Sequence, residues 1–529
     1  MATIETADAV TIDPKRDRLV ITASSLGTVF EWYDFFVYGI LAALIGKLFF
    51  PSDNPAAATL LSLAAFGAGF GVRPLGAILF GYFGDKIGRK YTFLVTITLM
   101  GGATAAIGFL PTFASAGVVA TVLLVLLRCL QGLALGGEYG GAAIYVAEHA
   151  PKGKRGQYTS WIQASVAGGF LLAVLVVLST RLSMSPEAFE AWGWRVPFLL
   201  SILLLAISLW IRLKLSESPV FQAMKAAGTT SKNPFMDSLR YPGNIKRIFV
   251  AMFGVAAGLT VVYYNSQFYT LYFLTGTARV PETDTLIYMA CGAAIAAPFY
   301  VLFGKLSDTF GRKRLLLIGY ALTMLLTFPL FWTMAEAANP AMARASASSP
   351  VSLTVPDCPE FSVFAQKQTA DCAKALNFLS KRGISHSKSV GDAVVLKVGE
   401  QTVKGFDEKA FVAALESAGY PNESDPAERK PWLIVLCVAL LVILSAMTYG
   451  QVAAILVEMF PAKIRYTSMS IPYHIGTGYF GGFLPFFSQM IVVYTGGTFT
   501  GLWYTIGVVA MAFVVSAIWL PENRNVELD

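Results

Sequence analysis

Four charged residues stand in stretches of the sequence that are otherwise apolar. Glu31 and Asp34 lie three positions apart in one stretch, and Arg73 and Arg128 lie in two others. Residues three apart share a helix face, so both carboxyl groups would point to one side, with Arg128 as the expected partner. A buried carboxyl group gains or loses a proton when its burial or its pairing changes. These residues predict reversible protonation; a static buried ion pair is the alternative interpretation.

Glu138 is a further acid of this kind. It follows Arg128 by ten residues, which places it about 15 Å further along a helix and on a different face. Two interpretations stay open, a second proton site and an acid with a structural role. Glu31, Asp34, Arg128 and Glu138 are therefore the candidates for proton coupling.

The stretches that carry these charges are predicted membrane helices. Of 529 residues, 55% are hydrophobic and 14% charged, whereas soluble proteins carry about 25% charged residues. Crossing the hydrocarbon core takes about 20 apolar residues. Twelve stretches are expected to span it: 19–45, 59–83, 91–111, 117–148, 157–180, 194–214, 247–275, 284–306, 314–336, 431–458, 466–494 and 498–521. The predicted fold class is an all-α membrane protein of twelve transmembrane helices.

Basic residues gather on alternate loops and set the expected orientation. Lys and Arg concentrate on both terminal segments and after the even-numbered stretches, while the opposite short loops carry Lys47, Arg181, Arg195 and Arg279. Basic loops remain cytoplasmic, so both termini are expected in the cytoplasm. The net charge of +7 thus reflects topology and indicates no nucleic-acid partner.

Two motifs recur and predict two pseudo-symmetric six-helix bundles. The Glu148 to Arg155 segment is repeated as Glu458 to Arg465. An Asp at a helix end and an Arg four residues on can form charge pairs that hold two halves together in one state. Such a pattern predicts a cytoplasmic gate, with topology anchors as the alternative. The gate residues are Gly81, Asp85, Gly88 and Arg89, repeated as Gly304, Asp308, Gly311 and Arg312.

The motif that begins at Gly81 recurs 223 positions later, whereas the motif that begins at Glu148 recurs 310 positions later. An insert of about 87 residues in the second half explains the difference. The polar stretch 337–430, after the ninth predicted helix, is expected outside the cell. There, Cys358 and Cys372 would meet oxidising conditions and form a disulfide; free surface thiols are the alternative. Periodicity predicts helices over 372–381 and 408–418 and a hairpin of 393–398 with 401–404, a small α/β cap.

Polar and aromatic residues at mid-depth predict a substrate site between the halves. Tyr473 follows Gln163 by 310 positions, so the repeat places these two at equivalent positions. Any single tyrosine could equally serve helix packing. The candidates are Arg73, Arg128, Trp161, Gln163, Tyr263, Tyr264, Asn265, Gln267, Tyr449, Gln451, Tyr473 and His474.

The motifs resemble those of a known family. The duplicated loops, Arg128 to Gly132 and Leu520 to Glu522 resemble the major facilitator superfamily. The runs 31–39, 73–76, 136–140, 192–198 and 217–219 are similar to its metabolite:proton symporter family, which includes bacterial carriers for oxoglutarate, citrate, shikimate, proline and betaine. The resemblance covers the chain except the insert. It implies alternating access, and proton coupling by the helix 1 acid and the helix 4 arginine.

The expected function is a proton-coupled importer of a small metabolite in the bacterial inner membrane, with the proton as coupling ion and no cofactor or metal. Two buried arginines favour an organic anion, while the aromatic residues would equally suit a zwitterion such as proline or betaine. An uncoupled facilitator, a receptor that uses the insert as its ligand domain, and an intramembrane enzyme are the alternatives. An enzyme is the least favoured of these, because the predicted helices show no metal-binding cluster and no nucleophile–base pair.

The expected partners are the substrate and the lipid bilayer, and the expected state is a monomer. The expected divisions are 1–18 as N-terminal segment, 19–214 as first bundle, 215–246 as central loop, 247–336 and 431–521 as second bundle, 337–430 as insert and 522–529 as tail.

Overall fold

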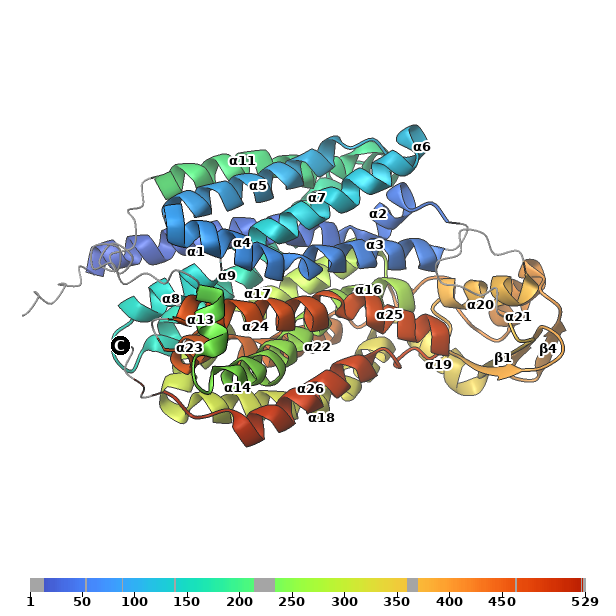
Figure 1. Ribbon diagram of the computed structural model, residues 1–529. Coiled ribbons are helices and arrows are strands. Elements are labelled where there is room, and N and C mark those ends of the chain that lie inside the picture. Colours follow the sequence, from blue (N-terminus) through green and yellow to red (C-terminus); the bar gives the residue numbers. More distant parts are fainter. Residues whose placement is uncertain are drawn as a thin grey trace, which may run out of the picture.

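The computed structural model describes residues 14–52, 55–87, 89–137, 139–213, 234–358, 370–461, 464–524 and 526. Its long helices run side by side between two ends of the molecule (Figure 1). The C-terminus lies at one end, here called the terminal end, and a small α/β unit lies at the other, here called the insert end.

The first bundle packs its helices around the first and fifth expected spans. Helix α1 packs against α9 and α11, α5 packs between α7 and α11, and α3 and α4 both contact α7. The long helices are α1 (Pro14–Ile40), α2 (Ala42–Phe49), α3 (Pro55–Gly71), α4 (Arg73–Ile87), α5 (Arg89–Phe109), α7 (Val118–Gly136), α8 (Tyr139–His149), α9 (Arg155–Leu182) and α11 (Arg195–Leu213), with short α6 (Phe113–Ala116), α10 (Pro186–Ala188) and η1 (Phe189–Gly193).

The second bundle has a buried central helix that alternates between α- and π-helical turns. This helix is α14 (Asn244–Phe249), η2 (Val250–Ala256), α15 (Ala257–Tyr264), η3 (Asn265–Tyr269), α16 (Thr270–Tyr272) and η4 (Phe273–Thr277), preceded by α13 (Pro234–Arg240). Around it lie α17 (Glu282–Phe310), α18 (Arg312–Ala338), α22 (Pro431–Tyr449), α23 (Val452–Met459), α24 (Arg465–Ile475), η6 (Gly476–Gly482), α25 (Leu484–Thr495) and α26 (Leu502–Trp519). π-helical turns are frequent at functional sites.

Glycines let the two bundles approach closely. Helix α9 of the first bundle packs along α17 of the second. A Cβ added at Gly156 would lie 2.5 Å from the Gly304 carbonyl oxygen, and one added at Gly304 would lie 2.4 Å from the Ser160 Cβ. The predicted gate glycine Gly304 is therefore required for contact between the halves, because any larger residue would push α9 and α17 apart.

Gly311 serves a different purpose, between α17 and α18. Its φ is +98°, a region that residues with a Cβ rarely adopt. Directly after it, the Glu522 carboxylate accepts hydrogen bonds from the backbone N–H groups of Arg312 at 2.9 Å and Lys313 at 3.0 Å. Glu522 thus caps the start of α18, where a negative charge is favourable.

The lengths and hydropathy of the helices fit a membrane protein. Among the described residues, eight helices are long and apolar enough to span a membrane, or up to ten if two bent pairs each count as one span. All twelve expected stretches are helical. The third contributes only the shorter apolar helix Leu94–Phe109, and the eleventh is divided between α24, η6 and α25 by a turn at Phe483. The count of twelve spans therefore stays a prediction.

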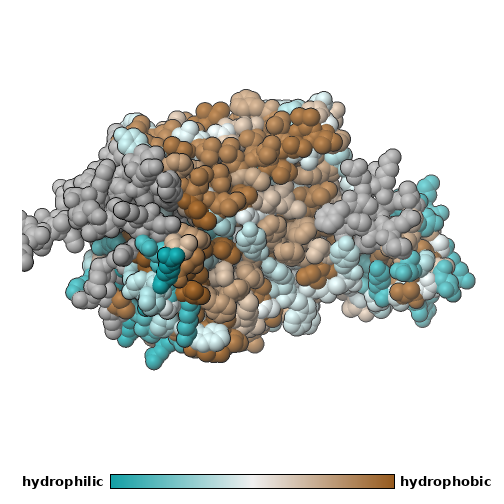
Figure 2. Space-filling model, viewed as in Figure 1, coloured by the Kyte–Doolittle hydropathy of each residue, from teal (hydrophilic) through white to brown (hydrophobic). Residues whose placement is uncertain are grey.

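The surface shows the same separation of apolar and polar residues. In Figure 2, hydrophobic side chains cover the middle of the visible face, while hydrophilic ones gather at the terminal end and over the α/β unit. An apolar belt of this kind is what contact with lipid chains requires.

The insert folds as a unit with its own core. Its sheet has the order β2–β1–β3–β4, with β1 parallel to β2 and antiparallel to β3. The expected hairpin is formed by β3 and β4. Strands β1 (Val351–Val355), β2 (His386–Val390), β3 (Val395–Val398) and β4 (Gln401–Lys404) pack against α20 (Asp371–Lys381) and α21 (Glu408–Ser417), with α19 (Pro340–Ser348) alongside.

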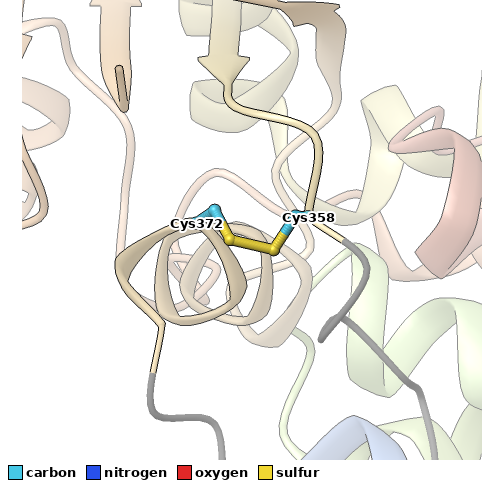
Figure 3. The surroundings of a disulfide bond; sticks show 2 residues. All are labelled: Cys358 and Cys372. Carbon is cyan, nitrogen blue, oxygen red and sulfur yellow. A yellow bond between two sulfur atoms is a disulfide. The ribbon is translucent and has the colours of Figure 1, made fainter. Parts of the chain in front are cut away.

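The predicted disulfide joins Cys358 to Cys372, with the two Cα atoms 6.2 Å apart. It ties the chain that leaves β1 to the start of α20 (Figure 3). The expected disulfide is thereby confirmed. Because the bridge closes a loop within the insert, it stabilises the insert mainly by restricting its unfolded chain.

Candidate functional site

Arg128 lies at the centre of the molecule and is fully buried in α7. Its Nη1 donates to Gln131 Oε1 at 2.6 Å, and Gln131 Nε2 in turn donates to Thr104 in α5 at 2.6 Å. The guanidinium carbon lies 4.3 Å from the ring centres of both Phe35 and Tyr38. Its Nε and Nη2 have no hydrogen-bond partner among the described residues. Arg128 is thus positioned by its neighbours yet keeps N–H groups for a further acceptor.

Arg73 is the second buried cation of the site. Its guanidinium carbon lies 5.3 Å from the Trp32 ring centre and 5.1 Å from that of Phe70. The Phe70 ring also packs 5.3 Å from the Tyr264 ring, and Phe66, 5.2 Å from the Arg128 guanidinium carbon, lies 6.3 Å from the same tyrosine ring. Phe66 and Phe70 thus connect both arginines to Tyr264 of the second bundle.

Tyrosines of the second bundle lie next to these arginines. The name central cluster is used here for Arg73, Arg128, Tyr263, Tyr264, Gln267, Tyr449 and Tyr473. The rings of Tyr263 and Tyr264 are 5.4 Å apart, and that of Tyr263 is also 5.4 Å from Tyr449. Tyr449 and Tyr473 share a hydrogen bond of 2.7 Å between their hydroxyl groups. The hydroxyls of Tyr263 and Tyr264, and both amide atoms of buried Gln267, have no hydrogen-bond partner among the described residues. Such groups are costly to bury unless a ligand or water satisfies them.

Two predicted site residues on the second bundle point elsewhere. The Asn265 side chain accepts a hydrogen bond from Thr505 in α26 at 3.3 Å. The Gln451 amide donates to the Arg312 carbonyl at 3.2 Å and accepts from the Leu316 backbone N–H at 3.1 Å, both in α18. Both side chains therefore serve packing between helices of the second bundle.

The remaining candidates divide between surface and interior. Trp161 is 48% exposed, and no contact among the described residues joins it to the central cluster, so its role at the substrate site stays a prediction. Gln163, two positions on and on another helix face, is fully buried. His474 is also buried, beside Tyr473 with 5.4 Å between the rings, and near Arg73.

The two acids of α1 are buried, and Asp34 does not pair with Arg128. The Asp34 carboxylate accepts a hydrogen bond from the Ser201 hydroxyl of α11, and no cation pairs with Asp34 among the described residues. The prediction of an Asp34–Arg128 ion pair was therefore wrong: α1 turns Asp34 toward α11 and presents Phe35 and Tyr38 to Arg128. Glu31 is 5% exposed. Glu138 lies outside the described residues.

The terminal end holds the two halves together through ion pairs. Asp308 accepts hydrogen bonds from the Gly156 and Gln157 backbone N–H groups of α9, at 2.8 and 2.9 Å, and pairs with Arg312 at 2.7 Å. This is how the predicted gate residues of the second bundle contact the first. Of the first-bundle gate, Gly88 and the side chains of Asp85 and Arg89 lie outside the described residues, as does the surface of Gly81.

The second duplicated motif supplies gate residues that the sequence reasoning missed. Arg155 of the first half pairs with Glu458 of the second at 2.9 Å, and Arg465 of the second pairs with Glu148 of the first at 3.1 Å. Glu458 also pairs with Arg312 at 3.0 Å. The signal was present in the sequence, because a Glu and an Arg seven positions apart occur in both halves. Their reciprocal pairing follows from the pseudo-twofold relation between the bundles.

Contacts also join the halves at the insert end. The Tyr272 hydroxyl donates to the Gly39 carbonyl of α1 at 2.5 Å, and Arg181 of α9 pairs with Glu282 of α17 at 2.5 Å. The Phe268 ring packs 5.5 Å from Phe36 and 5.3 Å from Phe66. The central cluster is thus enclosed by contacts between the halves on both sides, which is the arrangement of an occluded state.

Similarity to known proteins identifies the class of protein to which this chain belongs. A family model described as "Sugar (and other) transporter" matches residues 19–236. The shikimate transporter of Escherichia coli (strain K12) is 38% identical over 331 residues, which cover 62% of this chain and 75% of that protein. The proline/betaine transporter of Salmonella typhimurium is 34% identical over 337 residues, covering 62% and 67%.

A solved structure agrees at the level of the fold. The xylose transporter XylE from Escherichia coli, in a partially occluded inward-open conformation, has a TM-score of 0.62 at 16% identity, covering 97% of this chain and 100% of that one. The chain belongs to the major facilitator superfamily. It is a multi-pass membrane transporter of small molecules and not an enzyme.

Proposed function

We propose that the protein is a proton-coupled importer of a small organic anion in the bacterial inner membrane, with both termini in the cytoplasm. The observation that carries this proposal is the state of Arg128, a fully buried guanidinium whose Nε and Nη2 have no hydrogen-bond partner among the described residues. Adjacent N–H groups of a guanidinium match the two oxygens of a carboxylate. A carboxylate substrate would therefore satisfy Arg128 when it occupies the site.

The tyrosines would orient the rest of the substrate. The unpartnered hydroxyls of Tyr263 and Tyr264 and the amide of Gln267 can donate to or accept from hydroxyl groups. Because Arg128 belongs to the first bundle and these residues to the second, a substrate between them would bind both halves at once. Such binding couples substrate occupancy to the relative position of the bundles.

Asp34 is the proposed carrier of the coupled proton. It is buried, and its described partner is the neutral hydroxyl of Ser201. An ionised carboxylate at this depth is expensive unless it is paired or hydrated, so a proton would bind there when the site closes. The proton is the only coupling ion proposed, and no other cofactor is needed for this step.

A zwitterionic osmolyte such as proline or betaine is the second candidate substrate class. The aromatic rings of Tyr263, Tyr264, Phe66 and Phe268 lie next to one another, and aromatic faces attract quaternary ammonium groups. The similarity to proline/betaine transporters supports this candidate, as that to the shikimate transporter supports the anion.

The test is an uptake panel in proteoliposomes with labelled shikimate, citrate, oxoglutarate, proline and glycine betaine, with and without an uncoupler. The proposal expects accumulation of a carboxylate that the uncoupler abolishes. Arg128→Lys is expected to raise the KM for this substrate about 10- to 100-fold, the loss for a hydrogen bond to a charged group. Uptake of betaine alone would make a zwitterion, and not an anion, the substrate class. Uptake that the uncoupler does not reduce would indicate a facilitator.

A further inference from the structure

A cavity of about 200 Å³ lies beneath the insert, where three parts of the chain meet. Thr59 and Leu60 of the first bundle, Tyr272 and Gln489 of the second, and Lys381 and His386 of the insert all line it. Engineered cavities of about 150 Å³ hold a benzene molecule, so this space accepts a small ring compound. It lies at the insert end, outside the central cluster.

The insert is seated firmly on the second bundle. The Arg279 side chain donates to the backbone carbonyls of Asn422 at 2.9 Å and Lys381 at 3.0 Å, and Arg429 pairs with Asp284 at 2.5 Å. Arg279 adopts a φ of +60°, which is unusual for a residue with a Cβ and persists only where the surroundings hold it. The insert residues that line the cavity are thus held in a fixed position on the second bundle.

His386 supplies a specific polar group to this cavity. It is 6% exposed, its Nδ1 donates to the Ile384 carbonyl at 3.0 Å, and its Nε2 has no hydrogen-bond partner among the described residues. A neutral imidazole that donates from Nδ1 has an acceptor at Nε2. A ligand hydroxyl or ammonium group would satisfy it. Lys381 adds a positive charge to the same lining.

Tyr272 connects the cavity to the central site. It lines the cavity, its hydroxyl donates to the Gly39 carbonyl of the first bundle at 2.5 Å, and its ring lies 6.5 Å from that of Phe268, which packs 5.5 Å from Tyr264 of the central cluster. Breaking the bond to Gly39 would remove a contact between the two halves that lies between the cavity and the central cluster.

The geometry points to an outer binding site for the transported molecule in this cavity, which a small hydroxylated carboxylate occupies before Tyr272 admits it to the central site. The carboxylate would face Lys381 and a hydroxyl would face His386. This inference rests on the proposed function, because it uses the same substrate class. It gives the insert a part in transport that the bundles alone cannot supply.

The test is equilibrium binding of labelled shikimate to the full-length protein in lipid nanodiscs. The wild type is expected to bind two molecules per chain. Ala43→Trp, which fills the cavity from the first bundle, is expected to bind one, and Ser115→Trp, a bulky change at an exposed position outside the cavity, still two. His386→Ala is expected to weaken the second site about 2- to 10-fold, the loss of one hydrogen bond, while Ser387→Ala leaves it unchanged.

Each outcome decides between the two proposals. One bound molecule in the wild type and in Ala43→Trp alike overturns the outer site and leaves the central anion site standing. Two molecules in Ala43→Trp overturn the placement of the second site in this cavity. No binding by the wild type overturns the proposed substrate class, and the outer site with it. An unchanged melting temperature for each variant establishes that the fold is retained.

Discussion

At the scale of single residues, neighbours decide what each buried charge can do. Arg128 is held by Gln131 and by three aromatic rings but keeps N–H groups that have no hydrogen-bond partner in the described part of the chain, which suits reversible binding of an anion. Asp34 is held by one neutral hydroxyl, which suits reversible protonation. A direct ion pair between them would have satisfied both groups and left less reason for either to exchange partners.

Asp34→Asn should uncouple transport without destroying the substrate site. The amide cannot carry a proton but keeps the size and the bond to Ser201. With an imposed gradient of about one pH unit, one-to-one coupling gives the wild type about tenfold accumulation. For the variant we expect equal substrate concentrations inside and outside the vesicle, while exchange of labelled for unlabelled substrate is retained. Accumulation at the wild-type ratio would contradict the role of Asp34, and Glu31→Gln tests the other candidate acid of α1 in the same assay.

His386 makes the insert sensitive to acid. Its burial lowers the pKa of the imidazole, an effect that the charge of Lys388 strengthens and the bond to Ile384 opposes. Because the folded pKa lies below the unfolded value of about 6.5, the unfolded chain takes up the proton first as the pH falls. Stability is therefore full above the unfolded pKa and is lost toward the folded pKa, at up to about 1.4 kcal/mol per pH unit.

The measurement for this effect is the melting temperature of the purified protein at pH 7.5 and 5.5. We expect the insert of the wild type to lose stability over this interval and His386→Gln, whose side chain does not titrate, to lose less. An equal loss in both proteins would show that His386 is not the group responsible.

At the scale of the elements, two ion pairs join the halves at the ends of α8, α9, α23 and α24. Each half contributes one Glu and one Arg of the repeated motif, and each finds its partner in the other half. Opening at the terminal end must break both pairs together with the bonds from Asp308 to the start of α9. We therefore expect these ion pairs to favour the state that is closed at the terminal end.

A charge swap at Glu148 and Arg465 tests whether this ion pair holds the halves together. Glu148→Arg and Arg465→Glu should each favour opening at the terminal end, because like charges then face one another. The double variant should restore closure, with a coupling energy of about 1 kcal/mol or more. Distances between spin labels on α8 and α24 report the populations. If the double variant opens as far as the single ones, the pair does not hold the halves together.

At the scale of the whole molecule, the insert forms a small unit of its own at one end of the bundles (Figure 1). Its core is separate from that of the bundles. The backbone N–H of Lys430 donates to the Ala337 carbonyl at 2.9 Å, so the two ends of the insert lie side by side. The chain could therefore be joined across this point without moving α18 or α22.

Replacing residues 340–427 by a short flexible linker should leave a folded transporter. We expect uptake to continue with a KM raised about 2- to 10-fold, as for the loss of a hydrogen bond in the outer site. The measurement is uptake in proteoliposomes with wild-type protein as reference. Complete loss of transport by a folded variant would instead show that transport requires the insert, and would contradict this prediction.

The sequence by itself determined which segments are apolar enough to enter lipid, where the motifs repeat, and that 337–430 contains a hairpin and two helices. These properties depend on local composition and periodicity. Only the tertiary structure decided that Trp161 lies at the surface, that Asp34 faces Ser201 and not Arg128, and that the repeated Glu and Arg pair across the halves. The physical reason is rotation and packing: hydropathy places a residue at a depth in the membrane, whereas its partner depends on which helix packs against its face.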